Sequence, residues 1–316
     1  MIIEVDAFVA TTIGMLVFFL GALLTREIAF LRNFNIPEPV SGGLAVALVT
    51  WIVFAFFDRE IQFDLSVRDF LLVVFFTTIG LNARLSDLIA GGKLLGLLLL
   101  ATVAFIVMQN AVGLIGTFLF DLPTPVSVLV GSAALIGGHG TAIAWGPTIE
   151  ASTGFTGAAE IGIASATLGL IVAALVGGPI AKFLIERHEL KAEEGEQPMV
   201  GLEFEEKGEP GDSVSHVSLM RSMLAINLAI ILGYTAHYAL SEAGVQLPLF
   251  VPCLIVGIFL SNIVPLVFKR LVWPARTRAM AVISDYSLSV FLAMSLMSMQ
   301  MWTLVELGGP LLGILG

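Results

Sequence analysis

Charged residues are scarce in this chain, and their scarcity excludes most classes of soluble protein. Of its 316 residues, 13% are charged and 57% are hydrophobic, and the mean hydropathy is +0.98. A soluble domain carries about 25% charged residues. The composition therefore predicts a membrane protein with several spans. The net charge of −10 says little about partners, because nine glutamates lie in one hydrophilic stretch between residues 186 and 209.

Cysteine, basic clusters and catalytic motifs are also missing or nearly so. The single cysteine, Cys253, cannot form an internal disulfide and is best interpreted as a small buried side chain. Basic residues are few and scattered, so nothing indicates nucleic-acid binding. No HExxH motif, pair of intramembrane aspartates or GxxxxGKS motif occurs, and we therefore expect neither an enzyme nor a bound cofactor.

Long apolar runs account for most of the chain. A span needs about 20 apolar residues, and eight segments approach or exceed that length, although the third is short for a full span. The segments cover approximately residues 7–25, 36–57, 69–83, 94–120, 157–180, 217–240, 247–266 and 280–302. A further apolar piece covers 304–316. The one long hydrophilic piece, 182–216, predicts a flexible linker.

The basic residues predict the orientation of these spans. With the N-terminus outside, 13 of the 15 basic residues fall on the cytoplasmic side, and only Arg59 and Arg68 fall outside. The reverse orientation inverts that ratio, which the positive-inside rule disfavours. The N-terminal sequence MIIEVDAF lacks the basic region of a secretory signal, so the first apolar segment is expected to stay as a span.

A weak internal repeat connects the two halves of the chain. IPEPV at 36–40 is similar to LPLFV at 247–251, and DFLLVVFF at 69–76 is similar to DYSLSVFL at 285–292. We therefore expect an all-α polytopic membrane protein with inverted five-helix repeats, the first over 1–181 and an incomplete second over 217–316. The counterpart of the hairpin described next would lie beyond Gly316, so either the chain is a piece of a longer protein or the repeat interpretation is wrong.

A glycine-rich stretch, GSAALIGGHGTAIAWG at 131–146, interrupts the apolar pattern. Two flanking pieces are each too short to cross a bilayer, which predicts a re-entrant hairpin over about 126–154. Broken backbone at membrane depth is tolerated where it is buried in protein or lines a wet cavity. Its free N–H groups bind anions, and its carbonyls and hydroxyls suit a hard cation such as Na⁺. The alternative is that the glycines only permit close helix packing.

Polar residues in and near this stretch are the candidate binding residues. For the substrate they are Ser132, Gly137, Gly138, His139, Gly140, Thr141 and Glu160; for Na⁺ they are Ser132, Thr141 and Asn110. His139 is either a proton carrier or substrate donor, or a neutral hydrogen-bonded residue that shapes the hairpin. Glu160 either holds a substrate ammonium group or a cation within the membrane, or faces water at the outer interface. Asn110 and its neighbour Gln109 either join helices or contact a ligand directly.

No lysine or arginine is expected at mid-membrane, so a carboxylate would have to be held by backbone dipoles, hydroxyls and amides. Inverted repeats with broken helices are typical of secondary transporters. A transporter is therefore favoured over a channel, which saturable uptake against a gradient would exclude.

Several motifs, in order along the chain, resemble the bacterial sodium/glutamate symporters. They are IPEPVSGGL (36–44), FFTTIGLNARLSDL (75–88), MQNAVG (108–113), GGHGTAIAW (137–145), EIGIASATLGL (160–170) and SLSVFLAMSLM (287–297). The resemblance implies sodium-coupled uptake of glutamate by a homodimer in the bacterial inner membrane, with two inverted repeats whose hairpins meet mid-membrane. A sodium symporter for another carboxylate, or a channel, is the alternative.

The resemblance also sets an expectation about the end of the chain. The family pattern continues through another span, a second glycine-rich hairpin and a last helix, and the sequence ends before them. Residues 1–316 alone are therefore expected not to accumulate glutamate, since the site would lack its second wall.

Overall fold

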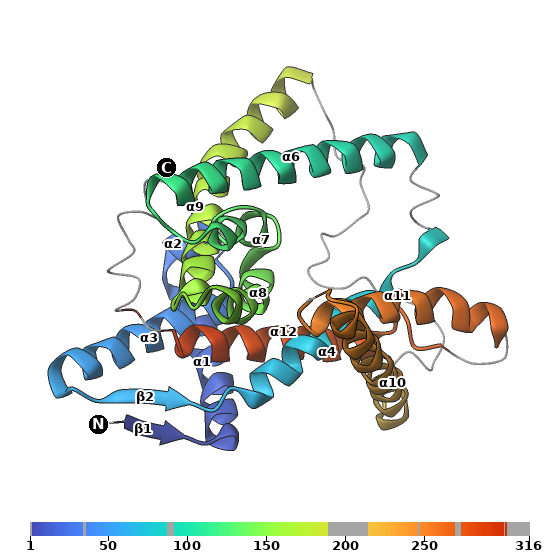
Figure 1. The fold of residues 1–316 in the computed structure, drawn as a ribbon, viewed down its shortest axis with the longest axis horizontal. Helices are drawn as coiled ribbons and strands as arrows, with labels where there is room; N and C mark the ends of the chain where they lie inside the picture. The colour runs from blue at the N-terminus through green and yellow to red at the C-terminus, as the bar shows by residue number, and fades with distance from the viewer. Residues whose placement is uncertain are drawn as a thin grey trace. The chain divides into compact units, whose positions relative to one another are not determined.

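Helices dominate the computed structural model, which describes residues 2–33, 36–86, 92–188, 214–245, 247–268, 273–299 and 301 (Figure 1). The chain divides into two compact units. Unit 1 takes its described residues from 1–68, 102–198 and 290–316, and unit 2 takes them from 69–101 and 199–289.

Unit 1 begins with a short strand and two packed helices. Strand β1 (Ile2–Val5) pairs in parallel with β2 (Glu60–Phe63), which follows helix α3 (Glu38–Phe57). Asp6 caps helix α1 (Ala7–Glu27) by accepting bonds from the backbone N–H groups of Phe8 and Val9. The short helix α2 (Ala29–Asn33) connects α1 to α3.

Helices α1 and α3 pack so closely that their contact needs glycine. A Cβ atom added to Gly21 would lie 1.8 Å from the backbone oxygen of Glu38, and one added to Gly42 would lie 2.0 Å from the oxygen of Val17. Ser41, which is buried at this contact, lies with its hydroxyl 3.1 Å from that of Thr25. Small residues that let backbones approach are a usual basis of helix packing in membranes.

Four helical pieces follow in unit 1 after the long helix α6 (Gly92–Leu119), whose first residues belong to unit 2. They are η1 (Thr124–Val128), α7 (Ser132–Leu135), α8 (Gly138–Thr153) and α9 (Ala158–His188). Leu129, Ala142 and Ile161 are fully buried where these pieces pack. The core of unit 1 therefore lies around the glycine-rich stretch.

Unit 2 is built from α4 (Ser66–Asn82), α10 (His216–Glu242), α11 (Phe250–Val267) and the first part of α12 (Arg278–Met297). Its buried cluster includes Val74, Leu81, Ile226 and Met280. Helices α10 and α11 are in close contact, because a Cβ atom on Gly233 would lie 2.6 Å from the Cα atom of Cys253. Cys253 is buried, as its apolar surroundings predict.

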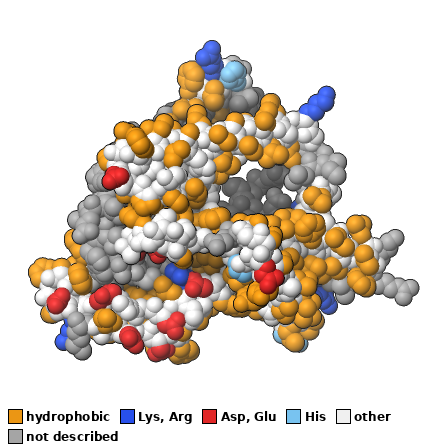
Figure 2. Space-filling model, in the orientation of Figure 1, with side chains coloured by type: hydrophobic (Ala, Val, Ile, Leu, Met, Phe, Trp, Pro, Cys, Tyr) orange, Lys and Arg blue, Asp and Glu red, His pale blue; other side chains and the backbone are white. Residues whose placement is uncertain are grey.

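The expected helices are present. Within the described residues, six are long and apolar enough to cross a membrane: α1, α3, α6, α10, α11 and α12. Helices α4, with 17 residues, and α9, with 31, cover the other two predicted segments. A helical protein with several membrane spans is thereby confirmed. Figure 2 shows hydrophobic side chains over most of the visible surface of α6, which is 6% buried across its most apolar window.

Two features differ from the sequence prediction. The strands β1 and β2 were not expected, because four residues carry too little alternation to signal a strand. Helix α9 continues to His188, beyond the expected end at 180, so residues 182–188 are helical where a linker was predicted. The sequence FLIER at 183–187 consists mainly of good helix formers. The rest of that predicted linker, through 213, and the apolar piece 304–316 lie outside the described residues.

Candidate functional site

The glycine-rich stretch forms a break between two helices, and two glycines make that break possible. Helix α7 ends at Leu135 and α8 begins at Gly138. Gly138 has a φ of +73°, where an L side chain is strained, although no atom of the described residues lies within 4 Å of its Cβ position. A Cβ atom on Gly137 would lie 2.6 Å from the backbone oxygen of Ala133. Gly138 is thus required for backbone conformation and Gly137 for space.

The N-terminus of α8 is left without a side-chain cap. The N-cap position is Gly137, and no side chain bonds to the first turn of the helix. The first N–H groups of a helix have no partner within it, so those of Gly138, His139 and Gly140 have no helical acceptor. They lie at the positive end of the helix dipole. This arrangement of N–H donors suits a carboxylate and requires no basic side chain.

Thr141 and Ser132, the two predicted ligands that carry hydroxyls, make different hydrogen bonds at the break. The Thr141 hydroxyl donates a hydrogen bond to the Gly137 oxygen over 3.0 Å, which leaves oxygen lone pairs for another partner. Ser132 is the first residue of α7, and its backbone N–H donates to Asn110 Oδ1 over 3.0 Å. Asn110 thus ties α6 to the break. The structure brings Asn110 and Ser132 together and favours the interpretation of Asn110 as a residue that joins helices.

His139 is buried, with 6% of its surface exposed, and bonds to α9. Its Nε2 lies 3.0 Å from Thr167 Oγ1, and that hydroxyl donates to the Ile163 oxygen over 2.9 Å. Because a hydroxyl has one proton to donate, Thr167 must accept from His139 Nε2–H. This hydrogen bond fixes the tautomer with the proton on Nε2. The bond joins α8 to α9 and so favours the hydrogen-bonded role for His139. The burial of the ring disfavours its charged form.

Glu160 lies in the first turn of α9 and is half-buried. A carboxylate near a helix N-terminus is stabilised by the dipole. This position near a helix end fits the interfacial alternative for Glu160 better than a place at mid-membrane.

A second carboxylate at the same helix end was missed by the sequence analysis. Glu150 Oε1 accepts hydrogen bonds from the backbone N–H groups of Gly157 and Ala158, over 3.1 and 3.0 Å. It therefore caps α9 from the preceding helix. The only sequence signal was an acidic residue in an otherwise apolar segment.

Gly140 and Gly146 bear on whether the glycines of this stretch form a binding site or only permit close helix packing. A Cβ atom on Gly146 would lie 2.7 Å from the Cβ of Ala159, and one on Gly140 would lie 3.1 Å from Cζ of Phe291 on α12. These glycines permit close packing, whereas Gly137 and Gly138 shape the break. The packing interpretation therefore accounts for Gly140 and Gly146, and binding at the Gly137–Gly138 break stays a prediction.

Buried polar atoms without hydrogen-bond partners lie near the break. Within the described residues, Gln109 Oε1 and Ser165 Oγ have no partner, and Ser165 is fully buried. Leaving such a group unpaired costs about 1–3 kcal/mol, so buried polar atoms of this kind often bind a ligand, an ion or water. Gln109 precedes Asn110, and Ser165 lies two residues before Thr167, which bonds His139. Sequence reasoning did not single out Ser165.

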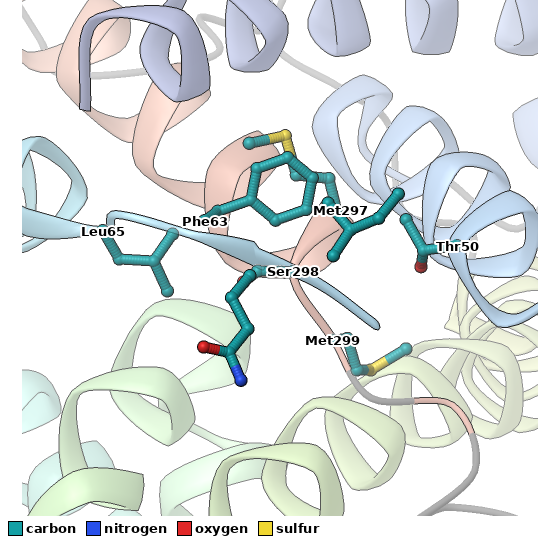
Figure 3. A pocket seen from close by; sticks show the side chains of 8 residues that line it. Thr50, Phe63, Leu65, Met297, Ser298 and Met299 are labelled. Carbon is teal, nitrogen blue, oxygen red and sulfur yellow. The ribbon is translucent and has the colours of Figure 1, made fainter. Parts of the chain in front are cut away.

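A separate cavity of about 240 Å³ lies in unit 1 between α3, β2 and the end of α12 (Figure 3). Thr50, Gln62 and Ser298 supply its polar groups, and Met297 and Met299 supply part of its apolar wall. None of the described lining residues is charged, and none belongs to the glycine-rich stretch. The predicted binding residues therefore do not line this cavity.

A family model and individual relatives both connect this chain to one family. A family model described as sodium/glutamate symporter matches residues 3–316. The chain is 38% identical over 308 residues to sodium/glutamate symporters of Escherichia coli (strain K12) and Shigella flexneri, covering 97% of this chain and 75% of each relative. It is 34% identical over 312 residues to that of Haemophilus influenzae, covering 96% of this chain and 74% of the relative. No solved structure matches.

Proposed function

The chain belongs to the sodium/glutamate symporter family, and we propose that it couples sodium entry to glutamate uptake across the bacterial inner membrane. The observation that carries this proposal is the uncapped N-terminus of α8 at a glycine break. Three backbone N–H groups there can donate hydrogen bonds to a carboxylate of glutamate, with Na⁺ as the coupling ion and no other cofactor required. Ser132, Gly137, Gly138, His139, Gly140 and Thr141 are the proposed substrate contacts, with Glu160 near the outer end of α9.

The sodium position follows from the oxygen atoms of the same break. The Thr141 hydroxyl and the carbonyls at the end of α7 are hard oxygen ligands of the kind that bind Na⁺ in broken helices. A cation held there and a carboxylate at the start of α8 attract one another. Each therefore raises the affinity for the other by the same coupling free energy. Such reciprocal coupling is what a sodium-driven importer requires.

We further propose that the chain is built from inverted repeats, 1–181 and 217–316, with a re-entrant hairpin over about 126–154. Local packing supports the equivalence of the first two helices in each repeat. Gly42 of α3 and Cys253 of α11 each lie five residues after a proline, Pro37 and Pro248. Both contact a glycine of the preceding long helix, Gly21 of α1 and Gly233 of α10 respectively.

Packing of the third helices gives a second line of support. Gly80 of α4 and Leu296 of α12 each lie 11 residues after the aspartate that begins their shared motif. Gly43 and Leu254 each lie six residues after their prolines. A Cβ on Gly80 would lie 2.2 Å from the Leu254 oxygen, and one on Gly43 would lie 2.3 Å from the Leu296 Cβ. In each contact a glycine of the first repeat thus faces a leucine of the second, at equivalent positions. The third helix of each repeat, α4 or α12, therefore packs against the second helix of the other repeat.

The proposed topology has the N-terminus outside and the segment 182–216 in the cytoplasm. It places 13 of 15 basic residues inside, as the positive-inside rule favours. We also propose a homodimer, because α6 is largely apolar and only 6% of its most apolar 18-residue window is buried. A second copy or lipid must cover such a surface.

The test is uptake of labelled glutamate into proteoliposomes that contain the complete gene product, compared with residues 1–316 alone, which are expected not to accumulate glutamate. Glutamate should accumulate above its outside concentration when an inward sodium gradient is imposed, and choline should not replace sodium. Aspartate and other dicarboxylates, tested as competitors, measure specificity. Uptake that persists without sodium and collapses with a proton uncoupler would contradict sodium coupling, and non-saturable flux only down the gradient would indicate a channel.

A further inference from the structure

We propose that unit 2 carries a binding site for an anionic phospholipid, in a groove between helix α10 and the segment Trp273–Pro274. The groove has a volume of about 850 Å³. It is lined along α10 by His216, Val217, Met220, Arg221, Met223, Leu224, Ala225, Asn227 and Leu228. The transport proposal does not use this groove.

The groove matches one leaflet of a bilayer in length. From His216 to Leu228 it follows α10 over 13 residues, and the 12 steps between them rise about 18 Å at 1.5 Å per residue. Half of the hydrocarbon core is about 15 Å thick. Since α10 begins at His216, a lipid in the groove would have its headgroup beside the first turns of the helix and its acyl chains alongside the later ones.

The two ends of the groove differ in chemistry in the way that a phospholipid requires. Near the start of α10, Arg221 and His216 provide positive or titratable groups. Farther along, Leu224 and Leu228 are 60% and 49% exposed. These long apolar side chains present a surface for acyl chains. Arg221 can extend its guanidinium towards the headgroup while its methylene groups stay in the apolar part.

Charge complementarity selects an anionic headgroup over a zwitterionic one. No acidic residue is among the described residues that line the groove, and Arg221 has no ion-pair partner within the described part of the chain. Ser215 and Ser218 already cap α10 through a reciprocal capping box. Recognition of an anion therefore falls to side chains.

Trp273 is the second group suited to a headgroup region. It packs against the buried cluster of unit 2 and also lines the groove. Its indole Nε1 is buried and has no hydrogen-bond acceptor among the described residues. Tryptophan is enriched at membrane interfaces, where the ring is in apolar surroundings and the N–H reaches a polar group. A phosphate or glycerol oxygen of a bound lipid would supply the missing acceptor.

The experiment is native mass spectrometry of the purified protein titrated with phosphatidylglycerol or with phosphatidylcholine of the same acyl chains. The wild type should retain phosphatidylglycerol more strongly. Arg221→Gln should lower that affinity about fivefold, the effect of one basic residue near an anionic surface. Arg187→Gln, which removes another exposed charge outside the groove, should leave it unchanged. Leu224→Trp, which fills the apolar part, should lower the affinity for both lipids.

Other results would overturn the site. Equal retention of the two lipids by the wild type would show no selection of the anionic headgroup. Equal losses in Arg221→Gln and Arg187→Gln would show diffuse surface attraction. Displacement of phosphatidylglycerol by inorganic phosphate at similar concentration would assign the groove to a soluble anion. Arg221 and Leu224 are exposed, so neither substitution is expected to prevent folding, and gel filtration checks this.

Discussion

Alanine at Gly138 should weaken glutamate binding, and alanine at Gly154 provides a matched control. Both glycines have positive φ, +73° and +70°, and no atom of the described residues lies within 4 Å of either Cβ position. Each substitution therefore adds backbone strain of about 1–2 kcal/mol and no steric clash. The two differ only in location, since Gly138 begins α8 and Gly154 ends it.

The strain at Gly138 should appear as lost affinity. If the break relaxes to a conformation with negative φ, the fraction of protein that presents the three N–H groups falls. The apparent dissociation constant rises in inverse proportion to that fraction. A cost of about 1–2 kcal/mol corresponds to an affinity roughly 5- to 30-fold lower for Gly138→Ala. Gly154→Ala should lose similar thermal stability and keep the wild-type affinity.

Equilibrium binding of labelled glutamate in saturating sodium, with thermal unfolding measured on the same samples, separates the two effects. Equal affinities in both variants, or an equal loss in both, would refute the assignment of glutamate to the start of α8. Loss confined to Gly154→Ala would move the site to the turn between α8 and α9.

Three further substitutions test the contacts that hold the fold. Gly21→Ala should lower the apparent melting temperature in detergent, because overpacking a close contact costs about 1–3 kcal/mol. Gly96→Ala should not lower it, since no described atom lies within 4 Å of that Cβ position. An equal fall in both variants would contradict the α1–α3 contact. Glu150→Ala should lower the free energy of unfolding by about 1 kcal/mol, because α9 loses its cap. Glu150→Gln should lower it less. If both variants were as stable as the wild type, the cap would be absent. His139→Gln should keep sodium-driven uptake and its pH dependence, since the amide can still bond Thr167; a flattened pH profile would instead indicate that His139 carries protons.

Sequence reasoning predicted the spans well because bilayer thickness fixes their length. Each of the eight apolar segments is a helix, and the break at Gly137–Gly138 lies within the stretch 131–146 that the glycine content singled out. Glycine content can reveal such a break because a positive φ or a close backbone approach excludes other residues. The same logic did not distinguish Gly146, whose role is packing against Ala159. Only the positions of neighbouring helices separate those two roles.

The parts that the sequence did not predict depend on contacts between separate segments. Glu150 caps a helix that begins eight residues later, across a turn, and no local capping pattern indicates this. The partner of His139 is Thr167, 28 residues away on another helix. Distances of that kind are set by how helices pack. The parallel pairing of β1 with β2, which joins residues nearly 60 apart, was missed for the same reason.

Histidine-selective ¹⁵N labelling gives the most direct test of the central claim, that backbone N–H groups at the start of α8 bind glutamate with sodium. The chain has four histidines, so the backbone spectrum is simple, and loss of one signal in His139→Gln assigns the amide of interest. Addition of glutamate in sodium should shift the His139 amide and leave His188, His216 and His237 in place, with no shift when choline replaces sodium. An unmoved His139 amide under saturating glutamate and sodium would contradict the account.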